Sequence, residues 1–419
     1  MNMRRGYAST MRRGYAILAA LISLVVLVCG AIYLGVGAAH GGTAGRTPPR
    51  TVVGWVGTWA AAPAEARAEG HRSDRSVRNV VHTSIGGSAA RVTLSNLLGR
   101  HPLTVAHVSL ALRAGNGPAA VPGTLRAVTF RGAGAVTIAA GAQSVSDPVA
   151  MDVPYDRDLL VTVHTPAGLG TFTVHPRARQ TSYLADGDRT RDLSGDAYTT
   201  RTRVWQHLTA VDVLTGDARG AIVAVGDSIT DGVTSTADTN RRWPDVLADR
   251  LNRRGAGHYG VLNEGISGNR LLHGGHGPST IARFDRDVLA RPGARTVILA
   301  IGINDLLHGP KTPSAAPVRA GLAQLARRAH AHGLRVIGAT LLPCGGHPRC
   351  TPEVDAVRGQ VNAAIRTSRV FDAVVDFDRA LRDQYAPARL RPAYDSGDHL
   401  HPSDAGYARM GMAVDPARL

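Results

Sequence analysis

The chain has 419 residues, of which 44% are hydrophobic and 19% charged, a balance that excludes a disordered protein and allows two domains with sizeable cores. The formal net charge is +16, and it comes almost wholly from arginine, since Lys311 is the single lysine. A nucleic-acid-binding protein would gather these charges in a stripe with aromatic residues between them. The arginines here are scattered and aromatic residues make up 5%, so we expect no nucleic-acid partner.

Residues 1–40 predict a signal or membrane anchor. An apolar run from Tyr15 to Ala39 is long enough to span a bilayer. Four arginines precede it and should stay in the cytoplasm: Arg4, Arg5, Arg12 and Arg13. The sequence therefore predicts an exported protein, anchored by residues 15–39 unless the segment is cleaved after Ala39. The phrase at Met3–Ala8 recurs at Met11–Ala16, so translation starts at Met1 or at Met11.

Residues 41–51 are rich in Gly, Thr, Arg and Pro, which is typical of a linker. Residues 52–216 then contain short runs of β-branched residues, separated by clusters of Gly, Pro, Asn and Asp. The clearest of these runs are 80–85, 90–95, 105–110 and 159–164. Many short strands with such turns favour an antiparallel β-sandwich domain.

From residue 217 to residue 419 the pattern alternates between strands and helices. Apolar runs predict strands at 221–225, 297–301 and 336–341, the last two continuous as in strands buried on both faces, and another strand is expected at 370–377. Helical spacing lies between them at 243–253, 318–332 and 354–366. This alternation predicts an α/β domain, in which a parallel sheet carries helices on both faces.

Four short stretches of this second half carry polar groups just after the expected strands. They are Gly226–Ile229, Asn263–Asn269, Gly302–Asp305 and Asp398–Pro402. Open α/β sheets place their sites at the carboxyl ends of the strands, so we expect these stretches to meet. Each stretch alone is a weak signal, but their order along one half of the chain favours a common site.

The residue types in these stretches suit acyl transfer through a serine. Ser228 offers a hydroxyl, which becomes a good nucleophile only when a base removes its proton. His401 is the candidate base, and Asp398 is three residues earlier, where it can bond the other ring nitrogen. The developing oxyanion needs fixed donors, and the backbone N–H groups of Ser228 and Gly268 with the amide of Asn304 suit that role.

The four stretches resemble the conserved blocks of the SGNH/GDSL hydrolase family, whose name lists a serine, a glycine, an asparagine and a histidine. The resemblance implies a flavodoxin-like three-layer fold and ester hydrolysis that needs no metal and no cofactor. The segments 55–60 and 91–96, together with the Cys344–Cys350 loop, resemble a secreted bacterial branch with a β-domain before the hydrolase. That branch contains acetylxylan esterases and lipases.

Other polar residues near these stretches are expected to have supporting roles. We interpret Asp227, Asp305 and Asp395 as hydrogen-bonding scaffold residues, and His399 as a neighbour of the base. His273 and His276 lie in a glycine-rich loop without a carboxylate, so a loop is favoured over a metal site.

Cys344 and Cys350 are separated by a short loop that also contains His347. In an exported protein such a pair favours a disulfide. The competing interpretation is a metal site with His347, which would lack a fourth ligand.

The sequence thus predicts an exported serine esterase that acts on acetylated polysaccharide. A lipase or lysophospholipase acting on longer acyl chains is one alternative. A surface protein whose β-domain binds a glycan, with little catalysis, is another. The five intact site residues favour an active enzyme.

Overall fold

The computed structural model describes residues 53–68, 74–166, 170–253, 258–309 and 313–419. The predicted anchor (1–40), its cleavage site, the whole of the linker (41–51) and residue 52 lie outside these described residues. Within them, no helix combines the length and the apolar character needed to cross a membrane. Thr51–Leu419 form one compact unit, so the predicted boundary between residues 216 and 217 stays a prediction.

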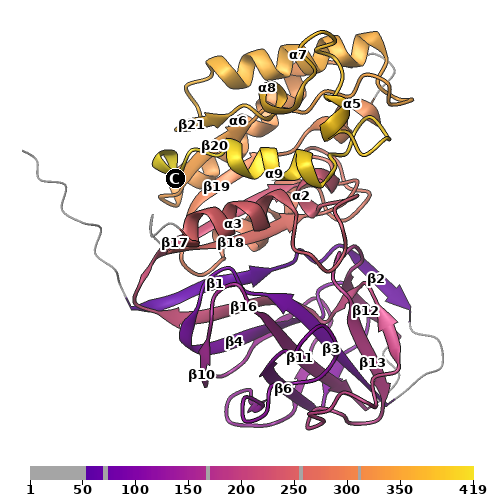
Figure 1. The fold of residues 1–419 in the computed structure, drawn as a ribbon, viewed down its shortest axis with the longest axis vertical. Helices are drawn as coiled ribbons and strands as arrows, with labels where there is room; N and C mark the ends of the chain where they lie inside the picture. The colour runs from indigo at the N-terminus through magenta and orange to yellow at the C-terminus, as the bar shows by residue number, and fades with distance from the viewer. Residues whose placement is uncertain (1–52, 69–73, 167–169, 254–257, 310–312) are drawn as a thin grey trace, which may run out of the picture. The chain divides into compact units, whose positions relative to one another are not determined.

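The first half is a β region in which every pairing is antiparallel, as the alternating sequence predicts (Figure 1). One sheet contains, in spatial order, β1 (Gly54–Ala60), β16 (Leu208–Thr215), β4 (Gly87–Ser95) and β10 (Val149–Val153), with β9 (Gln143–Val145) also paired to β4. A larger sheet contains β14 (Thr200–Thr202), β13 (Ser182–Asp186), β3 (Arg75–His82), β11 (Asp158–Thr165), β6 (His107–Leu112) and β7 (Arg126–Val128). Smaller sheets join β15 (Trp205–Gln206), β12 (Thr171–His175) and β2 (Glu65–Ala68), and β5 (Leu103–Val105) with β8 (Val136–Ile138). The described β region therefore has four sheets, more than the two of a simple sandwich.

The strand expected over 105–110 is broken at Ala106. β5 ends at Val105 and pairs with β8, whereas β6 begins at His107 and pairs with β11. The Ala106 N–H donates to the carbonyl of His164. One run of apolar residues thus contributes strands to two sheets, and the alternation of side chains alone does not show where the first strand ends.

The second half is an α/β region built on one parallel sheet. Its order is β18 (His258–Gly265), β17 (Ala218–Gly226), β19 (Ala294–Ala300), β20 (Arg335–Ala339) and β21 (Ala373–Val375). In chain order this is 2-1-3-4-5, the flavodoxin-like arrangement. The expected parallel α/β fold is confirmed.

Helices connect these parallel strands and follow the last of them. They are α2 (Ser228–Asp231), α3 (Trp243–Arg253), α4 (Thr280–Phe284), the π-helical turn η1 (Asp285–Leu289), α5 (Ile303–Leu307), α6 (Ala315–Ala331), α7 (Pro352–Thr367), α8 (Phe377–Leu381) and α9 (Asp404–Ala413), with 3₁₀ turns η2 (Pro392–Tyr394) and η3 (Pro416–Arg418). α3 contacts α9, and α6 contacts α7 (Figure 1).

Local signals explain where the helices begin. α3 matches the expected range of 243–253, and α6 and α7 start a few residues early because Ser314 and Thr351 cap them. The strand expected over 370–377 is wrong at both ends: β21 spans only Ala373–Val375. Asp376 ends it by accepting the N–H of Arg379 and capping α8.

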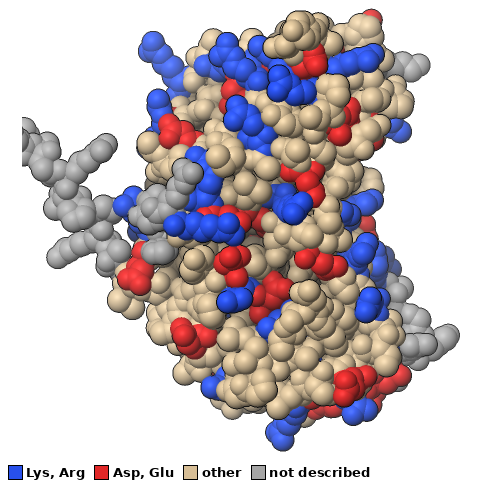
Figure 2. Space-filling view, in the orientation of Figure 1, with Lys and Arg blue, Asp and Glu red and all other residues tan. Residues whose placement is uncertain are grey.

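The two regions share one continuous hydrophobic core. β1 contacts β18, and the N–H of Gly57 donates to the carbonyl of Pro292. A Cβ atom on Gly260 would lie 2.0 Å from the carbonyl oxygen of Gly57, so only glycine allows this approach. On the face drawn in Figure 2, basic and acidic side chains are interspersed over both regions. The positive charge on this face is therefore spread and not gathered in one stripe.

Candidate active site

Ser228 lies at the carboxyl end of β17, where the strand turns sharply into α2. Ala221–Val225 are fully buried, and the strand ends at Gly226. A Cβ atom on Gly226 would lie 2.2 Å from Thr230 Oγ1 and 2.6 Å from the carbonyl oxygen of Ala300, so glycine is required. Asp227 caps α2 by accepting the N–H of Ile229 at 3.0 Å. The turn places the Ser228 hydroxyl at the edge of the sheet, where it lines a cleft.

His401 joins Ser228 to Asp398. Its Nε2 lies 2.8 Å from Ser228 Oγ, and its Nδ1 lies 2.6 Å from Asp398 Oδ2. With Asp398 ionised, Nδ1 carries the proton and donates it to the carboxylate, which leaves the lone pair of Nε2 to accept the serine proton. The three predicted residues come from β17–α2 and from the loop before α9, which are 170 residues apart in the sequence.

Asp398 is held in its ionised form. Partial burial alone would raise its pKa, but hydrogen bonds from the N–H of His401, the imidazole of His401 and the N–H of Leu400 outweigh burial and lower the pKa to about 2. The carboxylate therefore stays charged over the whole range in which an imidazole can act as a base.

The candidate oxyanion donors face the same cleft as the serine hydroxyl. Gly268 has a φ of +75°, and a Cβ atom there would lie 2.6 Å from the His276 ring. One amide hydrogen of Asn304 is used by the carbonyl of Asn269 at 3.1 Å, which fixes the side chain and leaves its second hydrogen free to donate. Ser228, Gly268, Asn304 and His401 all line this cleft. The structure thus brings together every catalytic residue that the sequence predicts.

The neighbouring aspartates support this constellation without entering the contacts of the base. Asp305 accepts the N–H groups of Leu271 at 2.7 Å and Leu272 at 3.0 Å, which ties the loop after Gly268 to α5. Asp395 bonds His399 Nδ1 at 2.7 Å, which forms a second His–Asp pair beside Asp398 and His401; here the imidazole is the more exposed partner. The scaffold roles expected for these residues agree with these contacts.

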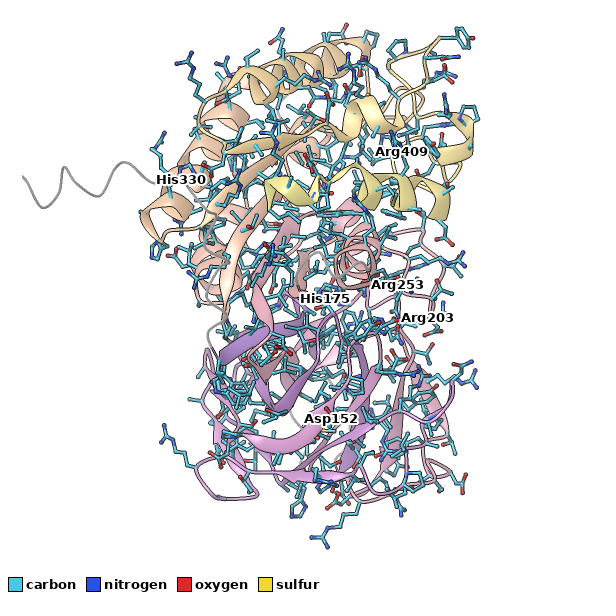
Figure 3. All side chains as sticks on the ribbon, turned by 60° about the vertical axis from the view of Figure 1, so that its left-hand side comes forward. Asp152, His175, Arg203, Arg253, His330 and Arg409 are labelled. Atoms are coloured by element: carbon cyan, nitrogen blue, oxygen red, sulfur yellow. A yellow bond between two sulfur atoms is a disulfide. The ribbon has the colours of Figure 1, made fainter. Side chains whose placement is uncertain are left out.

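A buried ion pair that sequence reasoning missed lies directly behind the site. His175 Nε2 in β12 is 3.0 Å from Oδ1 of Asp231, the last residue of α2. The other oxygen of Asp231 accepts the N–H of Ser267 at 2.9 Å and its hydroxyl at 2.5 Å. Ser267 is the neighbour of Gly268, so Asp231 connects the serine helix to the oxyanion loop. Figure 3 places His175 where the two regions meet.

The partners of His175 favour the protonated form of its imidazole. Burial would lower the pKa of the imidazole, but the Asp231 carboxylate and the carbonyl of Ala62, 2.9 Å from Nδ1, together raise it above its ordinary value. Both ring nitrogens donate in this arrangement, as in an imidazolium. No motif marks His175, which reads in the sequence as an ordinary strand residue.

The β region also forms part of the cleft wall. The cleft has a volume of about 590 Å³, and the β region contributes Ala64, Glu65, Arg67, Pro176 and Arg177 to its lining. The rest of the lining includes His276, His308, His347 and Arg349. The wall from the β region is thus continuous with the catalytic residues.

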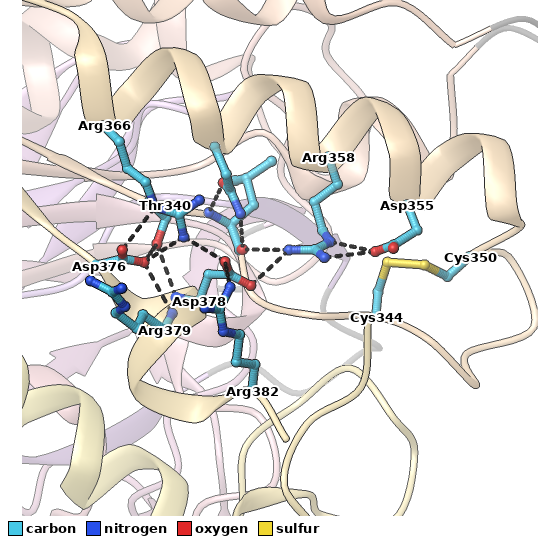
Figure 4. Close-up of polar contacts among 12 residues, drawn as sticks. Thr340, Cys344, Cys350, Asp355, Arg358, Arg366, Asp376, Asp378, Arg379 and Arg382 are labelled. Atoms are coloured by element: carbon cyan, nitrogen blue, oxygen red, sulfur yellow. Dashed lines mark hydrogen bonds and ion pairs between the residues drawn. A yellow bond between two sulfur atoms is a disulfide. The ribbon is translucent and has the colours of Figure 1, made fainter. Parts of the chain in front are cut away.

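The expected disulfide between Cys344 and Cys350 is present (Figure 4). Both sulfur atoms are used, so the alternative metal site with His347 does not form. Beside the disulfide, Arg358 bonds Asp355 at 2.7 Å and Asp378 at 3.0 Å, which fixes the start of α7. The loop closed by the disulfide carries His347 and Arg349 into the cleft. In the part of the chain that the structure describes, His273 and His276 belong to no group of three metal-binding side chains.

Comparison with known proteins finds a family match within the α/β region. Residues 224–409 match the model of the GDSL-like lipase/acylhydrolase family. No curated protein matches the chain.

Solved structures align with about half of the chain. A GDSL-like lipase from Bacteroides thetaiotaomicron has 22% identity and a TM-score of 0.36, over 46% of this chain and 85% of its own. Axe2, an acetylxylan esterase from Geobacillus stearothermophilus, has 23% identity and a TM-score of 0.36, over 47% and 93%. TesA has 27% identity and a TM-score of 0.35, over 46% and 95%.

The oxyanion donors are tested by two substitutions and a matched control. In Gly268→Ala the new side chain would clash with the His276 ring, and alanine would be strained at the left-handed φ of this position. The Gly268 N–H should therefore move, and kcat should fall by about 10²–10³. Asn304→Ala removes one donor and should cost a similar factor. Gly333 has the same backbone conformation, with φ +73°, but open space around it, so Gly333→Ala should keep its kcat. Equal activity in Gly268→Ala and Gly333→Ala would contradict the expected displacement of the Gly268 N–H.

The pH dependence of stability reports on Asp227. Burial, reinforced by the nearby carboxylates of Asp305 and Asp231, raises its pKa to about 7, from 3.8 in an exposed chain. Between pH 4 and pH 7 Asp227 is therefore protonated in the folded state but ionised in the unfolded state. The stabilisation from this proton is full below pH 4 and is lost as the pH rises to 7. The loss should be on the order of 4 kcal/mol.

Asp227→Asn keeps an oxygen for the N–H of Ile229 but does not titrate. Chemical denaturation should show this variant gaining stability over the parent between pH 4 and pH 8. Asp217→Asn, an exposed site, is the control and should show no such trend. A constant difference between Asp227→Asn and the parent across this range would refute the raised pKa.

Proposed function

Because residues 224–409 of this carboxylic ester hydrolase form a GDSL-like lipase/acylhydrolase domain, we propose that Ser228 forms an acyl-enzyme with short-chain esters of a polysaccharide. The observation that carries the proposal is the position of His401, which lies within hydrogen-bond distance of both Ser228 Oγ and Asp398. A hydroxyl, a base and a carboxylate in this geometry are the parts needed for nucleophilic catalysis.

In the first half of the reaction, Ser228 Oγ attacks the ester carbonyl while its proton passes to His401 Nε2. The negative charge that develops on the carbonyl oxygen is stabilised by the N–H groups of Ser228 and Gly268 and by the amide of Asn304. Asp398 stabilises the imidazolium. The C–O bond to the alcohol then breaks, the alcohol takes the proton from His401, and the acyl group stays on Ser228.

In the second half, His401 Nε2 takes a proton from a water molecule whose oxygen attacks the acyl-enzyme. The same donors hold the second oxyanion. Ser228 leaves with the proton from His401, and the carboxylic acid is released. One ester and one water give one acid and one alcohol, and the enzyme returns to its starting form.

Ser228→Ala tests the catalytic role directly. The hydroxyl has no substitute in the cleft, so ester hydrolysis should fall by at least about 10³ while the thermal unfolding curve stays that of the parent. His401→Ala should behave in the same way, whereas His399→Ala should stay active, because His399 has its own partner in Asp395. Unchanged turnover by a pure Ser228→Ala protein would disprove the proposed nucleophile.

The lining of the cleft supports a small acyl group on a hydrophilic alcohol. Around the catalytic residues it consists mainly of charged or polar side chains, with Leu400, Ile266 and Val233 among the few large apolar ones. Each methylene buried in a site is worth only about 0.8 kcal/mol, and only a few large apolar side chains line this cleft to bind a long chain. Donors and acceptors spread along an open cleft suit sugar hydroxyl groups.

The charges of the cleft favour an anionic substrate. Arg67, Arg177 and Arg349 line it against a single acidic lining residue, Glu65, and the Arg67–Glu65 contact is a loose one of 3.7 Å between exposed groups. Arg349 also donates to His308 Nδ1. Burial and the neighbouring Arg349 and Arg270 lower the pKa of His308, which keeps that ring neutral and able to accept. We therefore expect a sugar carboxylate near the scissile ester to raise affinity.

Substrate choice is tested with two series of esters. On acetyl, butyryl, octanoyl and palmitoyl p-nitrophenyl esters, kcat/KM should be highest for the acetyl or butyryl ester. Acetate release should be faster from acetylated glucuronoxylan than from acetylated neutral mannan, and Arg177→Ala should reduce this preference without changing hydrolysis of p-nitrophenyl acetate. A maximum at octanoyl or longer would indicate a lipase or lysophospholipase. Binding of glycan without acetate release would indicate a binding protein.

We further propose that the enzyme acts outside the cytoplasm, anchored by residues 15–39 or released from them. The apolar run at 15–39 and the Cys344–Cys350 disulfide, which an oxidising compartment preserves, support this location. Protease added to intact cells should digest the chain beyond residue 40. Protection of the whole chain until the cells are lysed would contradict the proposal.

A further inference from the structure

Two histidines of the β region lie side by side on one face of the larger sheet. His107 in β6 and His164 in β11 are cross-strand partners, so their side chains leave the sheet in the same direction. Their rings are nearly parallel, with an angle of 15° and a centroid separation of 6.1 Å. Asp188 reaches the same place from the turn that follows β13.

One oxygen of Asp188 is shared between the two imidazoles. Its Oδ2 lies 2.6 Å from His107 Nδ1 and 3.9 Å from His164 Nδ1. Its Oδ1 is used by Thr190, which donates its N–H at 2.9 Å and its hydroxyl at 2.7 Å. The carboxylate is therefore fixed by one oxygen and presents the other to two ring nitrogens.

The decisive group is the Nδ1 atom of His164. This imidazole is 7% exposed, and its Nε2 lies 2.7 Å from Asp74 Oδ1, to which it donates its proton. Nδ1 is then a lone pair in a buried position, and within the described residues it has no hydrogen-bond partner. A buried polar atom without a partner is unfavourable, and this one points towards Asp188 and His107.

We propose that His107, His164 and Asp188 bind a divalent metal ion of intermediate softness, such as Zn²⁺. Two imidazole nitrogens and one carboxylate oxygen are ligands that such ions prefer, and the remaining positions would hold water. The three donor atoms lie within 4.8 Å of one another, and two atoms bound to one ion at about 2.0–2.2 Å are at most about 4 Å apart. A small rotation of His107, whose side chain is 57% exposed, closes the difference.

Asp74 gives the site the outer contact that metal-binding histidines usually have. A carboxylate that accepts the proton of one ring nitrogen fixes the tautomer and directs the other nitrogen to the ion. Among the described residues, the other His–Asp pairs belong to no group of three metal-binding side chains. His330 Nε2, for instance, bonds Asp372 at 2.9 Å on the surface, and within the described residues His330 belongs to no group of three metal-binding side chains.

The ion would stabilise the β region and take no part in ester hydrolysis. It would bridge β6, β11 and the turn after β13, with Asp74 at the start of β3 as the outer contact. None of these four residues lines the catalytic cleft. An ion that binds the folded state alone stabilises it by RT ln(1 + L/Kd), where L is the concentration of free metal, so the unfolding temperature rises with that concentration.

The test uses the full chain, dialysed with Zn²⁺ and then against metal-free buffer, with metal content and unfolding temperature measured with and without EDTA. The parent should retain one Zn²⁺ more than His107→Gln and Asp188→Asn, and EDTA should lower its unfolding temperature by several degrees. His330→Gln should behave as the parent in both measurements. In all these proteins the rate of p-nitrophenyl acetate hydrolysis well below unfolding should be unaffected by EDTA.

His107 is the exposed ligand, so its variant should fold even if changes at the buried His164 do not. The proposal is overturned if His107→Gln and the parent retain the same amount of Zn²⁺, or if EDTA shifts both unfolding temperatures equally. A Zn²⁺ content that falls to zero in the parent on dialysis, an adventitious ion only, also overturns it.

Discussion

The catalytic arrangement depends on the interactions of one buried carboxylate, that of Asp231. It ends the helix that begins at Ser228, accepts two hydrogen bonds from Ser267 beside Gly268, and pairs with His175 of the β region. Three segments that are distant in the sequence thus meet at one charge. Since both partners are about 95% buried or more, removing one would leave the other charged and uncompensated, which typically costs about 3–5 kcal/mol.

This pairing makes the β region a working part of the enzyme. Through His175 it fixes the loop that carries Gly268, and through Glu65, Arg67 and Arg177 it forms one wall of the cleft. The shared core and the close approach of Gly57 to Gly260 fix the packing of the two regions against each other. Preorganised donors stabilise a transition state only when their positions are fixed before reaction, and the β region supplies part of that fixation.

Much of the α/β region could be predicted from the sequence, because its signals are local. Continuous apolar runs mark buried parallel strands, and Gly226, Ser228, Asn304 and His401 come directly after strands or before a capped helix. The β region is harder to predict from the sequence, because its strand pairings join segments that are far apart in the chain. Alternation does not show that a strand breaks at Ala106, and no motif marks His175 or the meeting of His107 with Asp188. A charge that is satisfied by a residue far away in the sequence leaves no local pattern.

The role of the β region in the active site is tested most directly by kcat for His175→Ala, compared with the parent at a temperature where both are folded. The variant keeps Ser228, His401 and Asp398 but loses the partner of Asp231. We predict that kcat for p-nitrophenyl acetate falls by at least tenfold while KM changes little, because the oxyanion loop loses its fixed position. A folded His175→Ala enzyme with the parent's kcat would contradict the claim that the β region helps to build the active site.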